Sequence, residues 1–272
     1  MFCSRYVVTL QAINNRTMDK AIAAAWDTVK APLKESLKLE ERMEVTTQLS
    51  KLTTRVATYV ICHTLVDYMG LLKDERISIA HAFLQRVTST HMCNHKLTAE
   101  GLVFRYQGEE IPLQEAYKTM TLTRTVYEHL VVFFFLFKYP LTGEESEMIW
   151  KHWKRTGQIG LKTKDGKRER VPYAQAWKYL FANEELSSLY RNMSLHCHPL
   201  YNGLKEYQYQ SAEEEENGWV PLYLSSCFVA YLCRLFLKLI PHGDEVVKGG
   251  FSMREQAVFY ALSNILLTTS ES

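Results

Sequence analysis

One short segment combines residue types that suit phosphodiester chemistry. Residues 188–199 read SLYRNMSLHCHP, with arginine at 191 and histidines at 196 and 198. On an α-helix Arg191 and His198 would lie about 20° apart, and His196 would lie about 140° from Arg191. Arginine keeps its charge and binds phosphate oxygens, whereas histidine exchanges a proton near neutral pH. The spacing predicts a site where one group stabilises developing charge and another moves a proton.

The strongest local cluster of positive charge lies in a segment that reads as a β-hairpin, residues 161–171, turning on Asp165 and Gly166. Such a cluster suits contact with a phosphate backbone. The alternative is an exposed hairpin that lysine keeps soluble. Its basic residues are Lys162, Lys164, Lys167, Arg168 and Arg170.

Other chemical signatures are weaker. His91 and His95 have the i, i+4 spacing of two metal ligands on one helix, although no carboxylate lies near them in sequence. The alternative is a polar helix end whose histidines lie near its negative pole. The chain lacks the G-x-G-x-x-G, G-x-S-x-G and H-E-x-x-H patterns. We therefore expect no bound cofactor or metal.

Composition limits the class of protein. The chain has 272 residues, 47% of them hydrophobic, which is enough for a large core. With 32 basic and 30 acidic residues, it lacks the overall positive field of a dedicated nucleic-acid binder, so any nucleic-acid contact is a local patch. No signal-peptide pattern opens the chain, and a cytoplasmic location is expected. The cysteines, none in a C-x-x-C pair, read as small buried residues of a reducing compartment: Cys3, Cys62, Cys93, Cys197, Cys227 and Cys233.

Periodicity and punctuation predict an all-α fold, a helical bundle with two small β-hairpin insertions. Asp74 is expected to cap one helix, Thr142 has capping-box spacing for another, and Gly157 ends that helix. The hairpins are expected near residues 102–111 and 161–171, with no large sheet. Helices are predicted over residues 17–30, 45–68, 74–95, 113–139, 142–157, 183–198, 221–240 and 253–267.

Two apolar runs need to be weighed against a membrane. Residues 130–137 read LVVFFFLF, which is too short to cross a bilayer and suits a helix buried on all sides. Residues 219–240 are long enough. They contain Arg234, Lys238 and a Ser225–Ser226 pair, so a buried core helix is favoured over a membrane span.

The segment from about residue 113 to 240 resembles the HEPN superfamily of all-α proteins, many of them ribonucleases of toxin–antitoxin and antiviral systems. Their motif is an arginine, usually followed by a polar residue, and then a histidine separated from the arginine by four to six residues. Arg191 with His196 matches the shortest spacing and Arg191 with His198 the longest. A preceding helix with Arg124 and Glu128 is similar to one in an uncharacterised bacterial HEPN-like family.

This resemblance implies a metal-independent endoribonuclease. Arg191 would bind the scissile phosphate, His196 or His198 would handle the proton, and Asn192 would position them. RNA contacts are expected at Arg124 and along the basic hairpin, with Glu128 near the site. The resemblance also implies a homodimer that shares one site, with RNA, an antitoxin or a defence protein as partner. It divides the chain into an N-terminal helical region, residues 1–110, and a HEPN-like region, residues 111–272, or makes it one continuous domain.

Two other classes of function remain open. In a non-catalytic helical interaction protein, Arg191 would pair with Glu128 and His198 would cap a helix C-terminus, so both would be structural. A hydrolase with a histidine and cysteine metal site is the third candidate.

Overall fold

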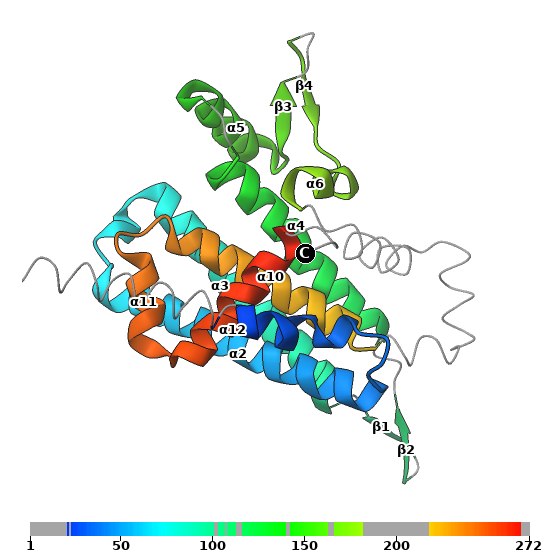
Figure 1. The fold of residues 1–272 in the computed structure, drawn as a ribbon. Helices are drawn as coiled ribbons and strands as arrows, with labels where there is room; N and C mark the ends of the chain where they lie inside the picture. The colour runs from blue at the N-terminus through cyan, green and yellow to red at the C-terminus, as the bar shows by residue number, and fades with distance from the viewer. Residues whose placement is uncertain are drawn as a thin grey trace, which may run out of the picture.

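The computed structural model describes residues 21, 23–100, 103–106, 108–112, 116–139, 142–162, 166–181 and 218–267. Within these residues the predicted fold class is confirmed. Long helices form a bundle, and in the described part of the chain strands occur only as two separate antiparallel pairs. The two hairpins project from opposite sides of the molecule (Figure 1).

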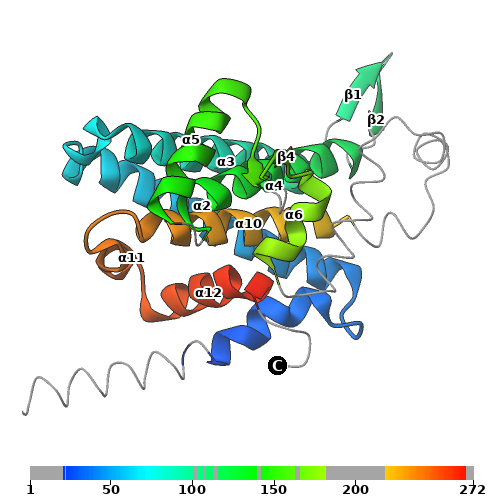
Figure 2. The same ribbon diagram turned by 90° about the horizontal axis from the view of Figure 1, so that it is seen from above.

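Four long helices make the body of the bundle: α2 (Leu39–Asp67), α3 (Glu75–Glu100), α4 (Ala116–Phe137) and α10 (Val220–Leu237). α10 lies at its centre and contacts α2, α3, α4 and α12 (Met253–Asn264) (Figure 2). Every residue of α10 except Arg234 is buried. One hydrophobic core therefore joins residues from both sides of position 110.

The two apolar runs are core helices in this arrangement. Residues 130–136 are all buried, as their all-round apolar character predicts, whereas Phe137 at the end of the run is only partly buried. By length and composition alone, Thr119–Phe137 and Val220–Leu237 are each able to span a membrane. The second of these segments is 94% buried inside the bundle, which is what a core helix requires.

The shorter elements flank this body. α5 (Gly143–Thr156) follows α4 and leads through the hairpin β3 (Gly160–Lys162) and β4 (Arg168–Arg170) into α6 (Tyr173–Leu180). The other hairpin, β1 (Val103–Tyr106) with β2 (Glu109–Pro112), joins α3 to α4. A further short helix, α11 (Gly243–Gly250), connects α10 to α12 and was not predicted. Short 3₁₀ turns lie at Ala31–Leu33, Leu71–Lys73 and Ile265–Leu267.

Local chemistry explains several helix ends. Asp74 Oδ1 accepts hydrogen bonds from the backbone N–H groups of Arg76 and Ile77, at 2.8 and 3.0 Å, as the predicted cap of α3. Gly157 adopts a left-handed φ of 69° and ends α5 as predicted. The predicted capping box at Thr142 is wrong in part: Thr142 precedes α5, but its side chain makes no capping hydrogen bond.

The interpretation of the cysteines needs a similar correction. Cys227 and Cys233 are buried in α10, where burial raises the pKa of both thiols. Cys62 and Cys93 are exposed, because they fall on the outer faces of α2 and α3. Cys3 and Cys197 lie outside the described residues.

Candidate functional site

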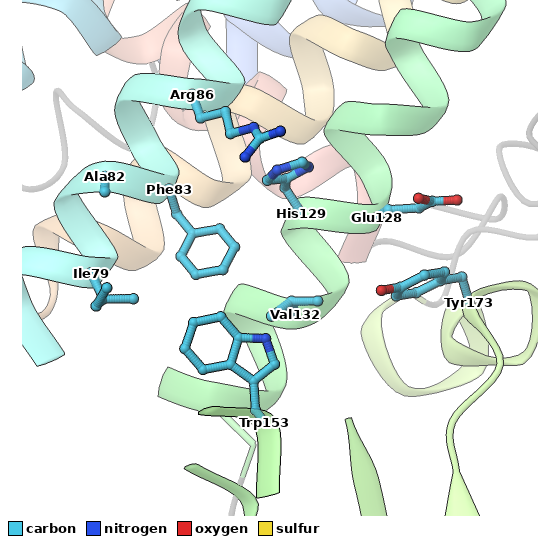
Figure 3. Close-up of a pocket in the computed structure, with 9 residues that line it drawn as sticks. All are labelled: Ile79, Ala82, Phe83, Arg86, Glu128, His129, Val132, Trp153 and Tyr173. Atoms are coloured by element: carbon cyan, nitrogen blue, oxygen red, sulfur yellow. The ribbon is translucent and has the colours of Figure 1, made fainter. Parts of the chain in front are cut away.

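An open pocket of about 320 Å³ lies between α3, α4, α5 and the start of α6. Its bed is apolar and its rim polar (Figure 3). Pockets of this kind, apolar with a few polar groups at the edge, are the usual form of small-molecule sites. The bed consists of Ile79, Ala82, Phe83, Val132 and Trp153, and the rim of Arg86, Glu128, His129 and Tyr173.

The aromatic part of the bed is held by contacts between α3, α4 and α5. The ring of Phe83 lies 5.9 Å from that of Trp153 and 5.9 Å from that of His129, measured between centroids. Trp153 also packs against buried Trp150 one turn away, at 5.5 Å. Ion pairs further attach α5 to the start of α3: Arg76 with Glu147, and Lys154 with Glu75 at 2.6 Å.

Tyr173 reaches the rim because α6 is attached to α4. The hydroxyl of Tyr127, a buried residue of α4, donates a hydrogen bond to the carbonyl of Tyr173 at 2.8 Å. The rings of Tyr127, Trp177, Phe181 and Phe228 pack together and join α4, α6 and α10. Burial raises the pKa of Tyr173, Glu128 raises it further, and Arg170 lowers it.

His129 is held in one orientation. Its Nδ1 lies 2.7 Å from the carbonyl oxygen of Thr125, one turn earlier on α4. A carbonyl only accepts, so in the neutral ring Nδ1 carries the proton and Nε2 the free lone pair. Burial lowers the pKa of His129 below its ordinary value, and Arg86 lowers it further, against the raising effects of the Thr125 hydrogen bond and Glu128. A neutral imidazole therefore stands at the rim near neutral pH.

Glu128, one of the predicted site residues, lines this pocket. Arg124 lies one turn earlier on α4 and donates from Nε to Glu128 Oε1 at 2.9 Å. Both side chains are about one-third exposed or less, at 27% and 30%. The structure thus brings together Arg124 and Glu128, and it adds to them three residues that the sequence analysis did not name as site residues: Arg86, His129 and Tyr173.

The basic hairpin forms as predicted, with Lys162 opposite Arg168 in register. Lys162 and Lys167 are exposed. Arg168 is half-buried and donates to the Gly160 carbonyl at 3.0 Å, so part of its hydrogen-bonding capacity serves the hairpin itself. Arg170 lies over the ring of Tyr173, at 6.0 Å from the centroid, and so links the hairpin to the pocket rim.

The remaining predicted site residues lie outside the described residues: Lys164, Arg191, Asn192, His196 and His198. Their predicted roles stay predictions. Arg86 and His129 had one weak signal in the sequence. The polar pair Glu128–His129 directly precedes the apolar run at residues 130–137, and Arg86 lies one turn after Phe83 on α3.

His91 and His95 are engaged with hydroxyl groups. Ser50 Oγ of α2 lies 3.1 Å from His91 Nε2 and 2.9 Å from His95 Nδ1, while Ser225 Oγ of α10 lies 2.8 Å from His91 Nδ1. The alternative interpretation as a helix end is wrong, because α3 continues to Glu100. Burial lowers the pKa of His91 to about 4. No group of three His, Cys, Asp or Glu side chains arranged to hold a metal ion occurs in the described part of the chain.

Comparisons of the chain with protein-family models, with curated proteins and with solved structures find no match. The resemblance to the HEPN superfamily therefore stays a prediction from the sequence pattern.

Proposed function

We propose that the protein is a metal-independent endoribonuclease that binds single-stranded RNA along the face formed by α4, α5, α6 and the β3–β4 hairpin. The observation that carries the proposal is the continuity between the basic hairpin and the pocket. The hairpin joins α5 to α6, the elements that supply Trp153 and Tyr173 to the pocket wall (Figure 1). Lysines of the hairpin that contact phosphates would thus hold an RNA strand next to the aromatic pocket.

The proposed chemistry is attack of the ribose 2′-hydroxyl on the adjacent phosphorus, which breaks the P–O5′ bond and leaves a 2′,3′-cyclic phosphate. A base removes the hydroxyl proton, and an acid protonates the leaving 5′-oxygen. In the roles that the HEPN resemblance implies, Arg191 binds the phosphate, His196 or His198 moves the proton, and Asn192 positions them. Glu128, paired with Arg124 at the pocket rim, supports this proposal by placing a predicted site residue beside a cavity.

The test is incubation of the purified protein with single-stranded RNA and with transfer RNA in the presence of a chelator. Cleavage should persist and leave cyclic-phosphate ends. Arg191→Ala should slow cleavage by about a hundred- to a thousand-fold, the usual effect of removing one donor to a developing charge. Replacing His196 and His198 separately should show which one moves the proton. Circular dichroism on each variant must show a folded protein.

RNA binding is tested independently of cleavage. The double variant Lys162→Glu/Lys167→Glu should weaken RNA binding. The slope of the logarithm of the binding constant against the logarithm of the salt concentration should become less steep by about 0.7 for each phosphate that the protein no longer neutralises. Lys51→Glu, which changes an exposed lysine on α2, is the matched control and should leave binding unchanged. Intact RNA after incubation with the wild-type protein, or a folded Arg191→Ala variant of full activity, would overturn the nuclease proposal.

One observation favours the second candidate, a non-catalytic interaction protein. Apolar side chains gather at the end of α2 and the turn that follows it, where Val66 is 73% and Met69 66% exposed. Leu65 beside them is 42% exposed. Exposed apolar clusters mark sites of protein association. Absence of RNA cleavage together with a self-association that Val66→Ser abolishes would favour this candidate.

A further inference from the structure

The pocket has one surface for a ring and another for an anion. Phe83 and Trp153 present aromatic area in its bed, and both are only partly buried. A ring stacked on exposed aromatic faces is a common form of nucleobase binding. Their own centroids are 5.9 Å apart, so a ligand ring lies against them and not between them.

Arg86 supplies the positive charge. Its side chain is exposed at the rim, and no carboxylate of the described residues forms an ion pair with it. The imidazole of His129 stands beside the guanidinium at the same edge of the pocket (Figure 3). Arginine binds phosphate oxygens through its planar set of donors. Among the described residues, this edge of the pocket therefore has a cation without an ion-pair partner, where an anionic group would fit.

His129 complements this cation. Because Nδ1 is engaged by the Thr125 carbonyl, Nε2 is the nitrogen left to a ligand. The charged and titratable groups that line the pocket with it are Arg86 from α3, Glu128 from its own helix and Tyr173 from α6, while α5 contributes the uncharged Trp153. A phosphate placed at Arg86 would offset the positive charge there and favour protonation of Nε2, which would then donate to a phosphate oxygen.

We propose that this pocket binds a nucleotide, with its base on the Phe83 and Trp153 rings and its phosphate between Arg86 and Nε2 of His129. The proposal rests on the proposed function for the source of the ligand, since the nucleotide is either a unit of an RNA strand or a free nucleotide. Binding takes up a proton at His129. The site is separate in sequence from the predicted motif at Arg191.

The pKa of His129 in the full-length protein, followed by NMR, tests the site without any measurement of cleavage. Saturating uridine 3′-monophosphate should raise this pKa by about one unit or more, and inorganic phosphate should raise it at higher concentration. Uridine, which has no phosphate, should leave it unchanged. Nucleotide binding should be tighter at pH 6 than at pH 8, because the bound state takes up a proton.

Two variants separate the parts of the site. Arg86→Gln should raise the pKa of His129 in the free protein and weaken nucleotide binding by at least about tenfold. Phe83→Ala should weaken nucleotide binding but leave inorganic phosphate binding unchanged. Arg155→Gln, an exposed arginine on α5 outside this pocket, is the matched control and should behave as wild type.

The source of the ligand follows from a hexanucleotide of uridine. If the hexanucleotide binds more tightly than the mononucleotide, and the Lys162→Glu/Lys167→Glu variant loses this added affinity, the pocket is assigned to RNA. Equal affinity assigns it to free nucleotides, and both results support the site. If RNA is not cleaved but the nucleotide still moves the pKa of His129, only the nuclease proposal fails. An unmoved pKa at saturating nucleotide and phosphate, or an Arg86→Gln variant with unchanged pKa and affinity, would overturn the inference.

Discussion

The buried histidine at the centre of the bundle makes the stability of this protein sensitive to acid. His91 lies between Ser50 of α2 and Ser225 of α10 and is fully buried. A neutral imidazole has one N–H and one acceptor nitrogen, so one serine accepts a hydrogen bond and the other donates one. Both ring nitrogens are then satisfied without a charge in the core.

The magnitude follows from the difference between the folded and unfolded pKa values. Burial lowers the pKa of His91 from 6.5 to about 4, and each pKa unit corresponds to about 1.4 kcal/mol. Above pH 6.5 both states are neutral, and stability is unaffected. Between pH 6.5 and 4 the unfolded chain takes up a proton that the folded chain resists. The free energy of unfolding should therefore fall by about 3 kcal/mol over this range through His91 alone.

The assay is urea denaturation at pH 7, 6, 5 and 4, comparing wild type with His91→Gln. The variant should be less stable at pH 7, because the glutamine does not reproduce both hydrogen bonds. The difference in free energy of unfolding between wild type and variant should decrease by about 2 to 3 kcal/mol toward pH 4, since the other titrating groups are common to both proteins. Parallel pH profiles for the two proteins over this range would refute the reasoning.

A pair of neighbouring serines gives a control. Ser225→Ala removes a partner of His91 and should cost about 1–3 kcal/mol at pH 7, the usual penalty for an unsatisfied buried group. Ser226 donates to the Leu222 carbonyl of its own helix, so Ser226→Ala should leave the slope of stability against pH unchanged.

Two further predictions concern the backbone of the helices. Gly243→Ala would place a Cβ 1.9 Å from the carbonyl oxygen of Leu237 and should destabilise the fold by about 1–3 kcal/mol or more. In the same helix, the new Cβ of Gly249→Ala meets nothing within 4 Å, so this variant should be neutral or stabilising by up to about 1 kcal/mol. Thermal melts compare the two variants, and equal melting temperatures would contradict the prediction. Asp74→Ala should lower the free energy of unfolding by about 1 kcal/mol because it removes the cap of α3. Thr142→Ala should lower it much less because that side chain makes no capping hydrogen bond. Similar decreases for the two variants in urea denaturation would count against this account.

Some features of the candidate site were readable from the chain and others were not. The sequence analysis placed Arg124 and Glu128 on one helix, but it offered Arg191 as the partner of Glu128. The ion pair between Arg124 and Glu128 was not predicted, although residues four apart on a helix face each other. The hairpin of β3 and β4 was predicted over residues 161–171 from the Asp165–Gly166 pair in the sequence and its flanking residues. The pocket was not foreseen, because its members come from residues 79–86, 128–132, 153 and 173, and no local pattern connects them.

By itself the sequence determined the all-α class, most helix bounds, both hairpins and the burial of residues 130–136 and of α10 except Arg234. These properties follow from periodicity, capping and apolar run length, which act within a few residues of the chain. The tertiary structure alone decided that Arg86 meets His129, that Tyr127 holds Tyr173 at the pocket rim, and that Ser50 and Ser225 enclose His91. Such contacts depend on which faces of separate helices pack together, and packing is set by the shape and volume of the whole core and not by any one segment.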